Sequence, residues 1–226
     1  SIATTEIYTH LDAEHVRSCK QWQRTLFDRG WAGIAWPKEY GGRGATAAEA
    51  RIFAREQARF DVDAGAFAVG IGMVGPTLIA HGTEAQKQRY LPALLRGDEV
   101  WCQLFSEPGA GSDLAGLRTR AVRDGDEWVV DGQKVWSSGA HHSELGILLA
   151  RTDPGAPKHK GITYFVLDMR SPGIEVRPLR QINGVAHFNA VFLTDVRIPH
   201  ENVVGEVNGG WGVALSTLGS ERVLIG

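Results

Sequence analysis

The spacing of the hydrophobic residues changes near residue 100, and this change restricts the fold more than any other feature of the sequence. In the first hundred residues, apolar side chains recur every three or four positions, which is the period of an α-helix with one buried face. The clearest sets are Val16, Cys19, Trp22 and Leu26, then Ala50, Phe53, Ala54 and Ala58, then Tyr90, Leu91, Leu94 and Leu95. We therefore predict an all-helical amino-terminal domain over residues 1–98.

From residue 100 onward, the apolar residues form short runs typical of β-strands. These runs are "WCQLF", "EWVV", "LGILLA", "ITYFVL", "IEV" and "AVFL", with turn pairs at Asp124-Gly125, Asp131-Gly132, Pro154-Gly155 and Pro172-Gly173. They predict an antiparallel β-barrel or two packed sheets over residues 99–211. Helical spacing returns at residues 212–226 and stops without a cap, so we expect the start of a truncated helical bundle there. The predicted fold class is α+β.

Composition and charge exclude several classes of protein. A formal net charge of -2 and the absence of a Lys/Arg block argue against nucleic-acid binding. The longest uncharged run, Ala64 to Ala80, contains four glycines and Pro76, and a membrane span needs about 20 mostly apolar residues, so we predict a buried helix rather than a span. Cys19 and Cys102 lack CxxC spacing, which argues against a disulfide framework or a zinc site. Without a signal peptide, a reducing, cytoplasmic compartment is expected.

Two segments contain too little apolar surface to be core. In "QLFSEPGAGSDLAG", Gly109 and Gly111 can adopt positive φ, which would let backbone N–H groups converge on phosphate oxygens, and Ser106 and Ser112 add hydroxyls. An ordinary β-turn is an equally good interpretation. In "GQKVWSSG", Trp136 follows a strand and precedes two serines. A tryptophan there is usually core, but it can also stack on a planar cofactor.

Other motifs are excluded by inspection. A dinucleotide-binding GxGxxG starting at Gly109 would need glycine in place of Leu114, and the chain contains no P-loop, GxSxG or HExxH motif. On an extended segment, the neighbouring His141 and His142 would point to opposite faces, so no metal site is predicted. The stretch "GWAGIAWPKEYGGRGA" is predicted to be an ordered loop that serves packing rather than ligand contact.

At their spacing, the two unusual segments resemble the acyl-CoA dehydrogenase family. The similar stretches are "FSEPGAGSDLAG", "VDGQKVWSSG", "FLTDVRIPHENVVGEVNGGW", "GIAWPKEYGG" and "HGTEAQKQRYLPALLRGDEV", and the resemblance runs from about Trp22 to the end. It implies an enzyme that uses FAD to remove two hydrogens across Cα and Cβ of an acyl-CoA. A carboxylate would take the α proton, hydride would pass to flavin N5, and electrons would leave through an electron-transfer flavoprotein. The product would be the trans-2-enoyl-CoA.

The resemblance also implies which residues form the flavin site. Gln103, Phe105 and Ser106 would contact the flavin, and Gly111 and Ser112 would lie at its pyrophosphate. Ser112 would in addition lie close to the CoA chain of the substrate. On the second segment, Trp136 and Ser137 would lie against the isoalloxazine ring, and the Ser138 hydroxyl would approach N5, where the family more often has threonine.

The catalytic base is expected at Glu221. Members similar to isovaleryl-CoA and long-chain dehydrogenases have this base as a Glu immediately before an Arg, and "LGSERVLIG" has Glu221 before Arg222. On a helix, Glu221 shares a stripe with Ala214, Thr217 and Leu224, and such neighbours suit proton abstraction. The alternative is a solvated or Arg-paired glutamate, with the base in the carboxyl-terminal bundle that completes the sites and builds the family's tetramer.

Substrate size and the function class leave alternatives open. By resemblance, "AGAFAVGIGMVGP" would line the acyl cavity, and its glycines at 65, 70, 72 and 75 predict a branched or bulky acyl group. The alternative is that these glycines only allow close helix packing. Competing functions are an acyl-CoA oxidase or flavin monooxygenase on the same fold, a non-catalytic partner subunit of a heteromeric dehydrogenase, and a small β-barrel binding module.

Overall fold

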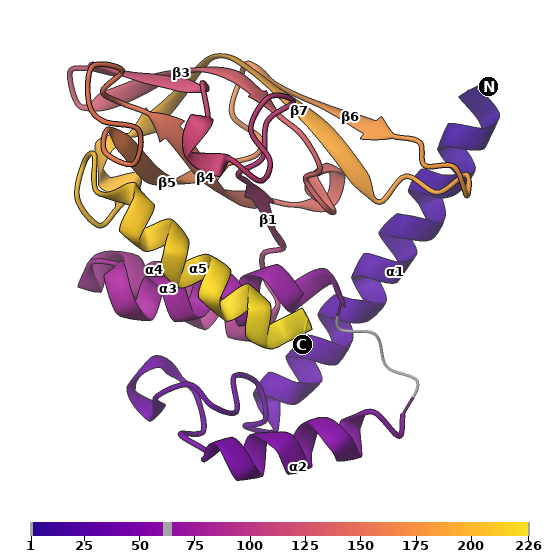
Figure 1. The fold of residues 1–226 in the computed structure, drawn as a ribbon. Coiled ribbons are helices and arrows are strands. Elements are labelled where there is room, and N and C mark those ends of the chain that lie inside the picture. The colour runs from indigo at the N-terminus through magenta and orange to yellow at the C-terminus, as the bar shows by residue number, and fades with distance from the viewer. Residues whose placement is uncertain (1, 61–64, 226) are drawn as a thin grey trace.

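The computed structural model describes residues 2–60 and 65–225, and it contains a helical part followed by a β part (Figure 1). The α+β fold class is therefore confirmed. The helices of the first part are α1 (Ile2–Asp28), α2 (Ala47–Gln57), α3 (Gly75–His81) and α4 (Glu84–Arg96). Capping boxes begin α2 at Thr46 and α4 at Thr83. The chain ends in α5 (Gly210–Ile225), as the apolar pattern predicts.

The uncharged run before α4 is a helical segment with an unusual turn. A short 3-10 helix, Gly65–Phe67, precedes a π-helical turn, Gly70–Val74, which continues directly into α3. Phe67, Val74 and Leu78 are buried, so the predicted buried helix is confirmed for the described part of this run. No helix within residues 2–60 and 65–225 is long and apolar enough to cross a membrane.

The β part is a single open sheet within the described residues. Its strands are β1 (Trp101–Leu104), β2 (Arg120–Asp124), β3 (Glu127–Lys134), β4 (Leu145–Arg151), β5 (Ile162–Asp168), β6 (Ile174–Leu179), β7 (Phe188–Pro199) and β8 (Val203–Val204). The order is β6-β7-β3-β2-β4-β5-β8, with β1 added beside β4. Most neighbours are antiparallel, but β4 pairs in parallel with β1 and, at one residue pair, with β2.

The strands do not close into a barrel but form one open sheet with two packed layers, which is close to the other predicted arrangement of two packed sheets. Side chains from β4 and β5 share one buried cluster with side chains from β3 and β7, so two halves of the same sheet face each other across a core. The predicted turn at Asp131-Gly132 is also wrong. Both residues lie within β3, where the register with β7 shifts between Val130 and Gly132. Such a bulge bends a strand without ending it.

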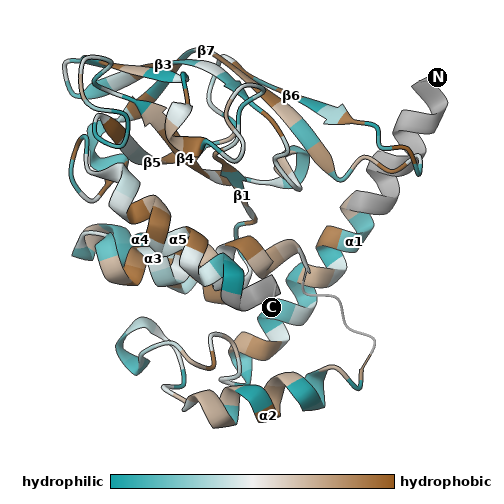
Figure 2. Ribbon diagram, in the orientation of Figure 1, coloured by the Kyte–Doolittle hydropathy of each residue, from teal (hydrophilic) through white to brown (hydrophobic). Residues whose placement is uncertain are grey.

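The sheet has a second core on the side that faces the helices. In β4 and β5, Leu148 and Phe165 belong to the cluster inside the sheet, whereas Ile147 and Tyr164 pack with α3, α4 and α5. Burial on both faces explains why "LGILLA" and "ITYFVL" are continuous apolar runs. Figure 2 shows hydrophobic residues, in brown, on the strands and helices where the two parts approach each other.

Helix α2 is the exception among the predicted core helices. Its existence is confirmed, but none of its described residues, Ala47–Gln57, is buried. Figure 1 shows α2 on the far side of the helices from the sheet. Its clearest attachment is a stack of Phe53 on Trp31, with ring centroids 5.3 Å apart. The loop that contains Trp31 is ordered, and it contributes to packing because Ala32 and Trp36 are buried.

Candidate functional site

The two unusual sequence segments lie side by side in the fold. One is the β1–β2 loop, residues 105–119, and the other is the β3–β4 loop, residues 135–144. The Val135 backbone N–H donates to the carbonyl of Ser106 at 2.9 Å, so the first residue of one loop is fixed to the second residue of the other. The segments singled out in the sequence therefore form one site.

A buried ion pair supports this junction. Lys134 is fully buried, and its Nζ donates to Glu107 Oε1 at 2.9 Å and to the Phe105 carbonyl at 3.1 Å. The Glu107 carboxylate also accepts the backbone N–H groups of Arg118 at 2.6 Å and Thr119 at 2.9 Å. Lys134 thus ties the end of β3 to the start of the β1–β2 loop, and Glu107 ties that start to the end of the loop.

Burial and pairing shift the pKa values of these two groups. Burial lowers the pKa of the Lys134 ammonium to about 8, against the opposing effect of Glu107. Burial raises the pKa of Glu107, but the charge of Lys134 and hydrogen bonds from Thr119, Lys134 and Arg118 outweigh it and leave that pKa below its ordinary value. Both groups are charged at neutral pH. Removal of one would leave the other buried without its counterion.

Trp136 is held in a conformation that is unfavourable for a tryptophan. Its φ is 62°, in the left-handed region, and 60% of its surface is exposed. The next residue is clamped to β7, because Ser137 and Asn189 exchange backbone hydrogen bonds at 3.1 Å and Asn189 Nδ2 donates to the Ser137 carbonyl at 2.9 Å. Strain that the surroundings enforce around an exposed aromatic ring is characteristic of ligand sites.

The remaining predicted flavin contacts differ in how accessible they are. Ser106 and Gln103 are half-buried and Ser138 is exposed. Phe105 is buried, with its ring edge-on to Tyr164 at 5.8 Å, so only its backbone can meet a ligand. Ser137 Oγ is buried and has no hydrogen-bond partner in the described part of the chain, and such atoms normally find one. An exposed indole, nearby hydroxyls and this buried oxygen fit an aromatic, polar-edged group such as FAD.

The glycines of the β1–β2 loop do not have the backbone conformation that was predicted for them. Neither Gly109 nor Gly111 has positive φ, so the proposed nest of left-handed glycines is wrong. A Cβ built on either glycine would meet no described atom within 4 Å. Their lack of a side chain therefore leaves open space beside the loop. Ser112 lies at this opening and is exposed.

The far end of the same loop lies beside a basic segment, "KHK" at residues 158–160. Lys158 Nζ is 2.5 Å from Oδ2 of Asp113, the residue that follows Ser112 in the chain. Arg151 holds the two segments together, because its guanidinium donates to the Ala115 carbonyl at 2.6 Å and to the carbonyls of Lys158 and Lys160 at 3.0 Å. Lys158 and Arg151 therefore contact the segment that follows the exposed Ser112.

Glu221 lies on α5 and belongs to neither loop. Its side chain is half-buried, and the preceding members of its predicted stripe, Ala214 and Thr217, are fully buried. Glu221 thus projects from the packed side of the helix. Leu224, the last member of that stripe, lies outside the residues whose side chains are described.

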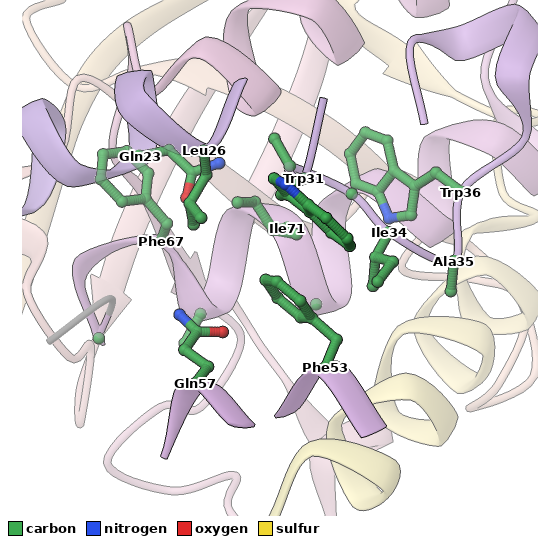
Figure 3. A pocket seen from close by; sticks show the side chains of 15 residues that line it. Gln23, Leu26, Trp31, Ile34, Ala35, Trp36, Phe53, Gln57, Phe67 and Ile71 are labelled. Carbon is green, nitrogen blue, oxygen red and sulfur yellow. The ribbon is translucent and has the colours of Figure 1, made fainter. Parts of the chain in front are cut away.

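A cavity of about 440 Å³ opens in the helical part (Figure 3). Aromatic and aliphatic side chains form most of its wall, including Trp31, Phe53 and Ile71. The small residues Gly65, Ala68 and Gly72 also line it. Gly70 and Gly75 instead face Leu94 and Trp36, which occupy the space that a Cβ would need. Only two of the four glycines therefore widen the cavity.

The prediction that His141 and His142 lie on an extended segment is wrong. His141 and His142 lie in a 3-10 turn, Ala140–His142, and their ring centroids are 3.9 Å apart, so they do not point to opposite faces of an extended segment. Even so, no group of three or more His, Cys, Asp or Glu among the described residues could hold a metal ion. Cys19 and Cys102 are both buried, and neither forms a disulfide within residues 2–60 and 65–225.

Sequence reasoning missed the residues that support the two loops. Lys134 lies on the same face of β3 as the buried Trp128 and Val130, so the strand period of two could have indicated an inward lysine that needs a carboxylate. Glu107 stands in the quoted "SEP" of the β1–β2 loop. Asn189 lies within an apolar strand, and no local signal identifies its role.

Family models match most of the chain. The amino-terminal domain of acyl-CoA dehydrogenases matches residues 2–98, and the middle domain of the same family matches residues 102–196. The chain is 54% identical over 201 residues to the acyl-CoA dehydrogenase FadE34 of Mycobacterium tuberculosis, covering 89% of this chain and 28% of that protein. It is 45% identical to the acyl-CoA dehydrogenase IpdE1 of the same organism, covering 90% of this chain and 53% of that one.

Solved structures have the same fold. The Tcur3481-Tcur3483 steroid ACAD superposes with a TM-score of 0.82 at 39% identity, over 100% of this chain and 62% of that chain. The ChsE4-ChsE5 complex from Mycobacterium tuberculosis superposes with a TM-score of 0.79 at 39% identity, over 91% and 52% respectively. The chain spans about half the length of IpdE1 and a smaller share of FadE34.

Proposed function

The chain belongs to the acyl-CoA dehydrogenase family, and from this premise we propose that it provides the flavin and substrate sites of an FAD-dependent enzyme that converts an acyl-CoA to the trans-2-enoyl-CoA. The observation that carries the proposal is the junction of the two loops, where Val135 bonds Ser106, Lys134 pairs with the buried Glu107, and the exposed, strained Trp136 follows directly in the chain. We divide the chain into residues 1–98, 99–211 and 212–226, the last being the start of a carboxyl-terminal helical domain.

Members of the family are FAD-dependent flavoproteins, and FAD when bound supplies the two-electron oxidant. In this chain Trp136 and Ser137 would hold the ring system, and the hydroxyls of Ser106 and Ser138 would donate to its polar edge. The backbone at Gln103 and Phe105 would border the same ring. Gly111 leaves room for the pyrophosphate, and the exposed Ser112 can donate to it and to the CoA chain.

Glu221 would take the α proton of the thioester. Its position one turn after the buried Thr217 keeps it on the packed side of α5. Glu221→Gln in the flavin-loaded protein should keep bound flavin and thioester affinity but slow anaerobic flavin reduction by about a hundredfold, the usual scale for a positioned base. Glu206→Gln, at an exposed glutamate, is the matched control. Unchanged reduction by Glu221→Gln would place the base elsewhere.

The acyl group would be branched or bulky. Support comes from the small residues Gly65, Ala68 and Gly72 on the cavity wall, and from the steroid named for one related structure. Gly72→Leu should raise KM for cyclohexane-1-carbonyl-CoA more than for butyryl-CoA, with Gly219→Leu on the exposed face of α5 as the control. Faster turnover of butyryl-CoA than of bulky thioesters by the unmodified protein would contradict this proposal.

The basic segment beside Ser112 would bind the phosphates of CoA. Lys158, His159 and Lys160 are all exposed there, and Arg151 fixes their backbone. Lys160→Ala should raise KM for a CoA thioester and leave KM for the matching pantetheine thioester unchanged, because pantetheine lacks the nucleotide phosphates. Equal changes for both thioesters would argue against a phosphate contact.

The electron acceptor and the assembly are part of the same proposal. We propose that electrons pass to an electron-transfer flavoprotein and that the enzyme is a homo- or hetero-tetramer, since two related structures are named as pairs of chains. Oxygen consumption that matches flavin reoxidation would instead indicate an oxidase or monooxygenase. Native mass spectrometry gives the subunit count.

A non-catalytic partner subunit is the competing function. Such a subunit has no need of an exposed indole held under strain, which favours the catalytic proposal. The visible spectrum separates the two. Yellow protein that an acyl-CoA bleaches anaerobically is the enzyme, whereas colourless protein is the supporting subunit.

A further inference from the structure

Three buried hydroxyl groups meet where α5 crosses the helices and the sheet. Thr217 Oγ1 of α5 lies 2.9 Å from Thr77 Oγ1 of α3 and 3.1 Å from the Tyr164 hydroxyl of β5. All three side chains are at most 1% exposed. The group is therefore a closed polar contact inside an otherwise apolar core.

Thr217 is the centre of this cluster, because its hydroxyl lies within hydrogen-bond distance of both other hydroxyls. Burial raises the pKa of Tyr164, so its phenol stays protonated, and either this hydroxyl or that of Thr217 donates in the bond between them. Thr77 also lies within hydrogen-bond distance of the Met73 carbonyl at 2.8 Å, and Thr217 of the Val213 carbonyl at 3.1 Å. Whichever hydroxyl donates in each pair, Thr217 bonds both Tyr164 and Thr77. Loss of this one hydroxyl would remove the Thr217 bond from the buried Tyr164 hydroxyl, whereas Thr77 would keep its bond to the Met73 carbonyl.

Each member of the cluster leads to a different part of the proposed site. Thr77 bonds the carbonyl next to Gly72, which lines the helical cavity. The Tyr164 ring packs edge-on against Phe105, the residue before Ser106 in the β1–β2 loop. Thr217 precedes Glu221 by one helical turn on the same face of α5. The cavity wall, the flavin loop and the proposed base are thus each connected to this cluster, by a backbone hydrogen bond, a ring contact and one turn of helix respectively.

We propose that Thr217 is a positioning residue that fixes the rotation of α5, so that Glu221 keeps its register with the cavity wall and the flavin loop. The inference rests on the proposed function of Glu221. A helix held only by apolar contacts can rotate by small amounts at little cost, whereas two buried hydrogen bonds to different elements define one orientation. The neighbouring contact of His81 Nε2 with Ser216 Oγ, at 2.7 Å, joins α3 to the same turn of α5.

The test compares Thr217→Val, which keeps the shape and removes the hydroxyl, with Thr217→Ser, which keeps the hydroxyl. The readout is anaerobic flavin reduction in the flavin-loaded protein, with whichever of butyryl-, octanoyl- or cyclohexane-1-carbonyl-CoA is oxidised fastest. Thr217→Val should lower the rate constant about tenfold or more, since small misplacements are costly, and leave the apparent Kd of the thioester nearly unchanged. Thr217→Ser should restore most of the rate.

Thr163→Val is the matched control for a merely structural effect. Thr163 is equally buried on β5, and its hydroxyl bonds Thr152 and Asn208 rather than α5. It should lower Tm without changing the reduction rate. If Thr217→Val behaves in the same way, the positioning role is overturned.

A double variant separates this inference from the assignment of the base. If Thr217 acts through Glu221, adding Thr217→Val to Glu221→Gln should slow reduction no further, whereas independent effects would multiply and overturn the inference. If Glu221→Gln is slow and Thr217→Val is normal, the positioning role fails and the proposed function stands. If Glu221→Gln itself is normal, the assignment of the base fails, and the positioning role fails with it.

Discussion

Residues 65–75 and residues 109–116 are both rich in glycine, but the structure places these glycines in opposite surroundings. At Gly70 and Gly75, the side chains of Leu94 and Trp36 fill the space that a Cβ would take. At Gly109 and Gly111, no described atom lies within 4 Å of the Cβ position. The first pair allows helices to pack closely, whereas the second pair keeps a surface open. Residue type alone does not distinguish packing from access.

The two regions also differ in what supports them. The glycine-rich helix is held by apolar contacts, and its neighbours Phe67, Val74 and Leu78 are buried. The β1–β2 loop is held by polar contacts to Lys134, Glu107 and Arg151. Substitutions in the first region should therefore change packing, and substitutions in the second should change either the buried charges or the ligand.

The largest effect is expected when the support of the β1–β2 loop is removed. Lys134→Met leaves Glu107 buried without its cation and should cost about 3–5 kcal/mol of the free energy of unfolding, measured by urea denaturation. Lys158→Met is the control, because the Lys158–Asp113 pair is exposed and should matter little. Equal stability of the two variants would show that the loop does not depend on buried charge.

The next effect concerns the packed glycines. Gly75→Ala should cost about 1–3 kcal/mol, because the Trp36 ring must move within a dense core. Gly219→Ala, on α5, meets no described atom and should stabilise the protein by about 0.5–1 kcal/mol through helix propensity. Opposite signs in thermal denaturation would support the contrast between packed and open glycines. A stabilising Gly75→Ala would break it.

A smaller change in stability is expected at the open glycines. Gly111→Val should alter the free energy of unfolding by no more than about 0.5 kcal/mol, since its new side chain contacts no described residue. The same variant should lose flavin, because the valine occupies the space proposed for the pyrophosphate. The flavin content of the purified protein is measured from its visible absorbance. A variant that is stable and fully loaded with flavin would refute the pyrophosphate assignment.

The smallest expected effect is the change in the free energy of unfolding at acidic pH that is due to Glu107. Because the folded pKa of Glu107 lies below its ordinary value of 4.5, its carboxylate stabilises the fold above that pH. This contribution is lost as the pH falls through the folded pKa. The stability difference between the unmodified protein and Glu107→Gln should therefore narrow with falling pH, as measured by urea denaturation at several pH values below 6. A constant difference would show that Glu107 does not titrate in this way.

The local period of the sequence predicted most elements of the fold, and its errors have identifiable causes. It found α4 and all six apolar strand runs, which correspond to β1 and β3–β7, because burial repeats along those elements. It missed β2, "RAVRD", where only Ala121 is buried and the pattern carries little signal. It predicted that α2 packs into the core, whereas Phe53 stacks on Trp31 with most of the helix outside. The predicted domain boundaries remain predictions.

For the candidate site, the sequence alone determined the identity of the two loops, because their Ser, Gly and Trp residues are unsuited to a core and resemble one family. Only the tertiary structure decided that Val135 bonds Ser106, that Lys134 supports Glu107, and that Thr217 joins Thr77 to Tyr164. These pairs are separated by about 27 to 140 positions in the chain. Hydrogen bonds and ion pairs require contact within about 3 Å, and periodicity over a few residues contains no information about such distant partners.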